Sequence, residues 1–287
     1  MRKAGVATLK ILAFLGLWAV LTAAVVLSAV AAAGEDFYAV RDVRLAVEIA
    51  LMLAVLAPLA AMARFVDKRA LSSIGFAVRR LPDLFVGAVL GALIFAAPLG
   101  LLVALGAAAY APDWSGFSAE ALGLGLTVCF VNVVTQQALV RSYIFQELWA
   151  KYGAWLATGV TTAMFVGLHA GPISQGTLGL IVGVNIMVAS LMMSLAYVRT
   201  GELWLPIGIH FGWNGLQGPV LNINVTGAGL AFGHWRVFEF DGEPLLTGGA
   251  LGVEGGLVGL IGPVLGLAIV AFAFKQQPTP SFVAAAK

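Results

Sequence analysis

Long apolar stretches alternate with short polar connections along this chain. Apolar runs lie near residues 8–33, 45–64, 84–109, 119–150, 154–170, 177–198, 203–220 and 250–274. An α-helix of roughly 20 apolar residues crosses about 30 Å of hydrocarbon, and most of the runs approach that length. Apolar positions are continuous rather than alternating, which favours helices over a membrane β-barrel. We therefore predict an all-α, polytopic membrane helical bundle with about eight transmembrane helices.

Composition supports the same class. Of the 287 residues, 61% are hydrophobic and 10% are charged, whereas soluble domains have roughly 25% charged residues. We expect a multi-pass integral membrane protein with the lipid bilayer as its main partner, and a bacterial inner membrane as its location. The net charge is only +2, and Lys and Arg lie at the ends of the apolar runs. This distribution argues against a nucleic-acid partner.

Positive charge is divided unequally between the two sides of the predicted bundle. With a cytoplasmic N-terminus, the outside loops contain only Arg41, Arg44 and Arg236. The positive-inside rule then places both termini in the cytoplasm. The inside positions are Arg2, Lys3, Lys10, Arg64, Lys68, Arg69, Arg79, Arg80, Lys151, Arg199, Lys275 and Lys287.

The first apolar run also resembles a secretory signal peptide, because it follows basic residues and ends in small ones. Its apolar part extends from Ile11 to Ala33, which is longer than the usual core of 7–15 residues. More hydrophobic runs follow it. We therefore expect an uncleaved first transmembrane helix.

Polar residues inside the apolar runs are concentrated in the second half of the chain. Such residues are costly in hydrocarbon, so each is a candidate for a functional site. Residues four positions apart share a helix face. Three pairs have this spacing, and His169 and Asn185 lie in two further runs; the pairs are Asn132 with Gln136, Gln137 with Arg141, and His210 with Asn214.

Arg141 leaves two alternatives open. A guanidinium stays charged and must find acceptors or reach the interface. Arg141 either extends to the interface from the end of its run or organises a polar site together with Gln137.

Two other kinds of site fit the sequence poorly. Two histidines and a carboxylate would suit zinc, but no carboxylate accompanies His169 and His210, and His234 falls in a loop. We therefore expect no metal and no other cofactor. A serine nucleophile needs a neighbouring base, and the spacing places no membrane serine beside a histidine. The single Cys129 excludes an intrachain disulfide.

Three motifs in order resemble the CPBP family of intramembrane glutamic endopeptidases, which includes CAAX proteases and bacteriocin-processing enzymes. Residues 136–141 resemble the motif Glu-Glu-x-x-x-Arg, with glutamine in place of both glutamates. Residues 165–169 match Phe-x-x-x-His, and residues 210–214 match His-x-x-x-Asn. Residues 203–209, 246–250 and 254–255 add to a resemblance that covers about residues 70–273.

The resemblance implies a role for each matching residue. The first glutamate and the histidine of the second motif activate water in that family, and these positions are Gln136 and His169. The third motif would stabilise the oxyanion through His210 and Asn214, and the arginine at 141 would hold position 137. The implied substrate is a membrane-associated or prenylated peptide, such as a CAAX-type or leader peptide.

The resemblance also divides the chain. It implies an N-terminal two-helix membrane region at residues 1–69, a protease-like core at 70–274 and a short cytoplasmic tail at 275–287. The oligomeric state is not encoded in these motifs.

Gln136 changes the expected activity, because an amide cannot take a proton from water. Loss of a general base reduces a rate by about 10²–10⁴-fold, so we expect this chain to be inactive or impaired, with His169 as a weaker base. Two interpretations stay open: a natural pseudoprotease that binds or regulates a membrane partner, or an enzyme silenced by engineered Glu-to-Gln changes. A transporter is less well supported, since the chain lacks visible inverted repeats.

Overall fold

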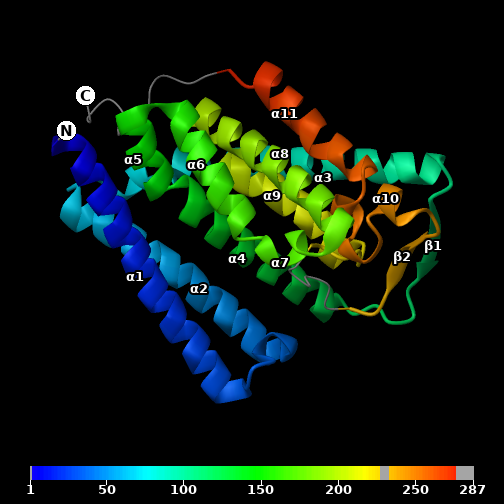
Figure 1. Ribbon diagram of the computed structural model, residues 1–287. Coiled ribbons are helices and arrows are strands. Elements are labelled where there is room, and N and C mark those ends of the chain that lie inside the picture. The colour runs from blue at the N-terminus through cyan, green and yellow to red at the C-terminus, as the bar shows by residue number, and fades with distance from the viewer. Residues whose placement is uncertain (1, 227–232, 276–287) are drawn as a thin grey trace.

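The computed structural model describes residues 2–226 and 233–275, which form a helical bundle (Figure 1). The predicted helical membrane bundle is confirmed. Its helices are α1 (Arg2–Ala33), α2 (Arg41–Ala61), α3 (Pro82–Ala104), α4 (Ala119–Arg141), α5 (Tyr143–Tyr152), α6 (Ala154–Gly167), α7 (Ala170–Ile173), α8 (Gly176–Thr200), α9 (Trp204–Gly215), α10 (Pro244–Thr247) and α11 (Ile261–Ala273).

Five helical segments of the described chain are long and apolar enough to cross a membrane: Gly5–Ala33, Val43–Val66, Val78–Ala104, Ala119–Tyr152 and Gly176–Thr200. The runs predicted at 154–170, 203–220 and 250–274 contain the shorter helices α6, α9 and α11. At 1.5 Å per residue, helices of this length cover about 20 Å, less than the hydrocarbon thickness. Eight crossing helices therefore stay a prediction.

Two local features differ from the predicted apolar runs. The run at 119–150 is interrupted at Ser142, whose backbone (φ −95°, ψ −104°) separates α4 from α5. The helix in the run at 84–109 ends at Ala104. It is followed by strand β1 (Ala108–Asp113), which pairs antiparallel with β2 (Arg236–Phe240). Hydropathy did not reveal this sheet, because its strands are short and far apart in the sequence.

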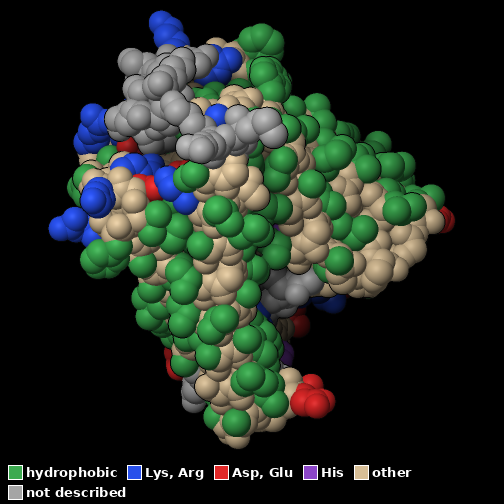
Figure 2. All heavy atoms as spheres, turned by 60° about the vertical axis from the view of Figure 1, so that its left-hand side comes forward, with side chains coloured by type: hydrophobic (Ala, Val, Ile, Leu, Met, Phe, Trp, Pro, Cys, Tyr) green, Lys and Arg blue, Asp and Glu red, His purple; other side chains and the backbone are tan. Residues whose placement is uncertain are grey.

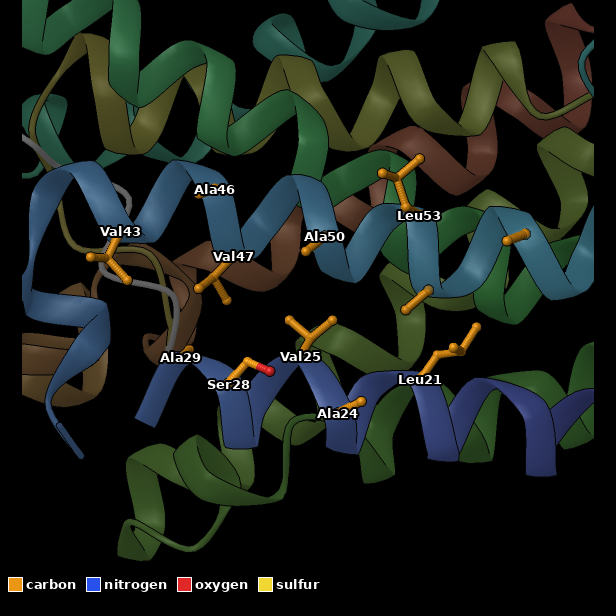
Figure 3. A pocket seen from close by; sticks show the side chains of 12 residues that line it. Leu21, Ala24, Val25, Ser28, Ala29, Val43, Ala46, Val47, Ala50 and Leu53 are labelled. Atoms are coloured by element: carbon orange, nitrogen blue, oxygen red, sulfur yellow. The ribbon is translucent and has the colours of Figure 1, made fainter. Parts of the chain in front are cut away.

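Helices α1 and α2 form a hairpin at one side of the bundle (Figure 1). Between them lies an open groove of about 820 Å³, where side chains of the two helices face each other (Figure 3). Its lining is hydrocarbon apart from one hydroxyl, so it is suited to lipid tails. The lining residues are Leu21, Ala24, Val25, Ser28, Ala29, Val43, Ala46, Val47, Ala50, Leu53, Ala54 and Ala57.

Lys and Arg side chains gather at one end of the molecule, and hydrophobic side chains cover its body (Figure 2). Asp67 accepts hydrogen bonds from Lys10 (2.6 Å) and Arg69 (3.1 Å), and Arg69 also donates to Gln146 of α5. The strands lie across the bundle from the N-terminus (Figure 1). By the positive-inside rule this basic end would face the cytoplasm, and the sidedness stays a prediction.

Helix α9, which carries two of the candidate site residues, is positioned by glycines that contact α3. A Cβ atom added to Gly208 would lie 2.2 Å from the carbonyl oxygen of Leu84, and one added to Gly212 would lie 2.0 Å from that of Ala88. Gly87 and Gly91 of α3 approach α9 equally closely. Small residues at a spacing of four let membrane helices pack backbone to backbone.

Replacing Gly212 with alanine is expected to destabilise the fold, because the methyl group would force α3 and α9 apart. Overpacking of this kind costs about 1–3 kcal/mol, which thermal unfolding in detergent would show as a lower melting temperature. Gly100 of α3 is the matched control, since its added Cβ would meet nothing within 4 Å. Equal melting temperatures for Gly212→Ala and Gly100→Ala would contradict the close contact.

Candidate active site

Four of the six predicted site residues line one cavity of about 70 Å³ inside the bundle. Gln136 comes from α4, His169 from the turn after α6, and His210 and Asn214 from α9. Gln137 and Arg141 are fully buried on α4 and are not part of the lining. The other lining residues are Phe165, Asn185, Ile186, Ala189, Met192, Met193, Ile209, Trp213, Val225, Thr226, Glu254 and Pro263.

His169 lies just outside a helix rather than within the predicted span, because α6 ends at Gly167 and His169 precedes α7. Its Nδ1 atom is 2.8 Å from the backbone oxygen of Phe165. A carbonyl oxygen only accepts, so Nδ1 carries the proton. The neutral imidazole therefore keeps a free lone pair on Nε2, which can act as a base.

His210 lies between two side-chain amides. Its Nδ1 atom is 2.9 Å from Nε2 of Gln137, and its Nε2 atom is 3.1 Å from the side-chain amide of Asn214. A neutral imidazole accepts at only one nitrogen, so both amides cannot donate to it. Arg141 donates to Oε1 of Gln137 (3.0 Å), which turns the Gln137 NH₂ group toward His210. Gln137 therefore donates to Nδ1 of His210, and Nδ2 of Asn214 lies beside Nε2 on the other side of the ring.

Arg141 does not extend to the interface, which settles the alternative left open by its position in the sequence. Its side chain is fully buried and donates to Ser190, at the backbone oxygen (3.0 Å) and at Oγ (2.6 Å), as well as to Gln137. The ring of Phe165 lies 5.0 Å from its guanidinium carbon. All of these partners are neutral, so Arg141 organises a polar site without a counter-ion among them.

Gln136 is oriented by a chain of polar contacts that leads to α2. Its Nε2 atom donates to Oδ1 of Asn132 (2.7 Å), and Nδ2 of Asn132 donates to the carboxylate of Glu48 (3.2 Å). These contacts confirm that Asn132 and Gln136 share a helix face. The other amide atom of Gln136, Oε1, is buried and has no hydrogen-bond partner in the described chain.

Glu254 is a lining residue to which the sequence analysis gave no role of its own. Its carboxylate accepts hydrogen bonds from Nε1 of Trp213 (2.8 Å) and from the backbone nitrogen (3.2 Å) and hydroxyl of Thr226. Glu254 thereby connects its own segment and that of Thr226 to Trp213 of α9, the residue before Asn214. An acidic residue in the glycine-rich beginning of the last apolar run was the available signal.

Other chemistries find no support in this geometry. Within residues 2–226 and 233–275, no three His, Cys, Asp or Glu side chains come together as a metal site. Ser190 is engaged by Arg141 and donates to Thr162 (3.1 Å) rather than to a histidine. His234 is not among the residues that line the cavity.

Comparison with protein-family models gives a match over part of the chain. Residues 118–216 match the family model described as type II CAAX prenyl endopeptidase Rce1-like. No curated protein and no solved structure matches the chain. The matched stretch contains α4 to α9 and all six predicted site residues. Residues 118–216 are thus similar to the Rce1-like type II CAAX prenyl endopeptidases, a likeness that supports an intramembrane protease scaffold.

Proposed function

We propose that the cavity is the hydrolytic site of a glutamic-type intramembrane endopeptidase, and that glutamine at position 136 impairs it in this chain. The observation that carries the proposal is the convergence of Gln136, His169, His210 and Asn214 from three parts of the chain on one cavity. The arrangement supplies a base position, an imidazole with a free lone pair and polar donors.

A glutamate at position 136 would supply the general base that the hydrolysis requires. The carboxylate, assisted by Nε2 of His169, takes a proton from water as the water oxygen attacks the peptide carbonyl carbon. The side-chain NH₂ group of Asn214 lies 3.1 Å from Nε2 of His210 and has a second N–H with which to donate to the oxyanion, an effect worth about 10²–10³-fold. When the C–N bond breaks, the proton passes to the leaving amine. In the unaltered chain Gln136 cannot take this proton, and His169 acts as a weaker base.

The proposed substrate is a membrane-associated peptide, such as a CAAX-type or leader peptide. The matching family model is described as a prenyl endopeptidase, and the cavity lies among apolar helices with Phe165, Met192 and Met193 in its wall. We place the protein in a bacterial inner membrane with both termini in the cytoplasm, in keeping with the basic end of the bundle.

Cleavage of a farnesylated peptide by the Gln136→Glu, Gln137→Glu double variant tests this function. We expect at least a 10²-fold gain over the unaltered chain and loss of that gain when His169→Ala is added. Met187→Leu is a control, because Met187 is a largely exposed residue of α8. Absence of cleavage by a folded double variant, with His169→Ala making no difference, would refute the endopeptidase.

A second function, non-catalytic binding of a membrane partner, is favoured by one observation. Gln137 uses both ends of its amide, toward Arg141 and toward His210, so the site is well organised with an amide there. A pseudoprotease that holds a partner helix or a lipidated tail would keep this cavity. Robust proteolysis by the unaltered chain would exclude this second function.

A further inference from the structure

Two residues that line the cavity each have a buried polar atom without a hydrogen-bond partner within residues 2–226 and 233–275. One is the donor Nδ2 of Asn185 on α8, whose side chain is 3% exposed, and the other is the acceptor Oε1 of Gln136 on α4. Both residues line the cavity together with the two histidines. Buried polar atoms are almost always paired, so this donor and acceptor point to a ligand that offers the complementary groups.

The orientation of Gln136 decides which of its atoms faces that ligand. Glu48 takes the amide nitrogen of Asn132, so Asn132 turns its oxygen toward Gln136. Gln136 must then use its own nitrogen for Asn132, and Oε1 is left for the cavity. A glutamate at position 136 would have two accepting oxygens, so it could not donate to Asn132 as the amide nitrogen does.

A backbone peptide group is the ligand class that matches. It presents one carbonyl acceptor and one N–H donor, the complements of Nδ2 and Oε1. The cavity volume of about 70 Å³ corresponds to about five water-sized probes at 10–15 Å³ each, which is room for a peptide unit. Ile186, Ala189 and Met192 beside Asn185 add an apolar wall.

We infer that Asn185 and Gln136 form a subsite for one peptide group of the bound chain, with Asn185 donating to its carbonyl oxygen and Gln136 accepting from its N–H. This inference rests on the proposed function, since it names the part of the substrate that the same cavity holds. It makes Asn185 a positioning residue that the three motifs do not include.

Equilibrium binding to the unaltered full-length chain in detergent tests the subsite. The probes are a fluorescent farnesylated C-a-a-X peptide and its ester analogue, in which oxygen replaces the N–H that follows the prenylated cysteine. We expect Asn185→Asp, which removes the donor at nearly constant shape, to raise the Kd of the peptide about tenfold. Asn185→Leu is expected to do the same, and the control Met187→Leu to leave the Kd unchanged.

The ester analogue examines the second hydrogen bond. Its Kd for the unaltered chain should be about tenfold higher than that of the peptide. For the Gln136→Met variant, the ester and the peptide should have equal Kd values. Unchanged affinities for folded Asn185→Asp and Asn185→Leu, no ester effect in the unaltered chain, or no binding of either probe would overturn the inference. Failure of the double variant to cleave would instead refute the peptidase and leave the binding pattern intact.

Discussion

Gln136→Glu alone is expected to recover at least the peptidase activity of the double variant, and Gln137→Glu alone is expected to recover little. Gln136 lines the cavity and has a free side-chain atom, whereas Gln137 is fully buried, lies outside the lining and is held by Arg141 and His210. We therefore expect a carboxylate at position 136, and not one at position 137, to activate a water in the cavity. The expected gain is about 10²–10⁴-fold, the usual effect of a general base.

A glutamate at position 137 is also expected to rearrange His210. A carboxylate only accepts, so it would favour the tautomer of His210 with its proton on Nδ1, and Nε2 would become the accepting nitrogen of the ring. Asn214 would then donate to Nε2 and lose a donor for the oxyanion. This is why the single Gln136→Glu variant is expected to equal or exceed the double variant.

Values of kcat/KM for the farnesylated peptide, measured for the two single variants and the double variant, check this order. His169→Ala added to Gln136→Glu serves as the inactive reference. If Gln137→Glu alone gave the larger gain, the assignment of the base position to 136 would be wrong.

Gln137→Glu is expected to raise the stability of the fold even though it adds little activity. Arg141 is a fully buried cation whose hydrogen-bond partners are Gln137, Ser190 and the backbone, none of them anionic. Removing one partner of a buried ion pair costs about 3–5 kcal/mol. Supplying the missing carboxylate, 3.0 Å from the guanidinium, is expected to raise the free energy of unfolding by an amount of that order.

A double-mutant cycle between positions 137 and 141 separates this pairing from other effects of the substitution. Thermal unfolding of the unaltered chain, Gln137→Glu, Arg141→Met and their combination gives the four corners. Gln137→Glu should stabilise the chain only when Arg141 is present, and should destabilise the Arg141→Met chain by leaving a buried carboxylate unpaired. Equal effects of Gln137→Glu in both backgrounds would show that the two residues do not form an ion pair.

Several features of this protein follow from local sequence. Long apolar runs are sufficient to predict a helical membrane bundle, because lipid leaves the backbone few other ways to pair its amides. Spacing of four residues was enough to place Gln137 with Arg141, and His210 with Asn214, because residues one helical turn apart lie on the same face. Hydrogen bonds within both pairs agree with that placement.

Other features depend on contacts between distant segments, which no local pattern encodes. Glycines of α3 and α9 set how closely these helices approach, although their Gly-x-x-x-Gly spacing was visible at 87–91 and 208–212. The break at Ser142, the β1–β2 pair, and the meeting of Glu254 with Trp213 and Thr226 appear only in three dimensions.

By itself, therefore, the sequence determined the membrane fold class and the residues that share helix faces, because backbone pairing and helical periodicity act locally. The tertiary structure decided that Gln136 faces the cavity while Gln137 supports it from behind, and that Arg141 is buried rather than at the interface. The physical reason is that neighbouring residues on one helix point in different directions. Only the packing of α9 against α4, and the hydrogen bonds from Arg141 of α4 to Ser190 of α8, show which direction leads to the cavity.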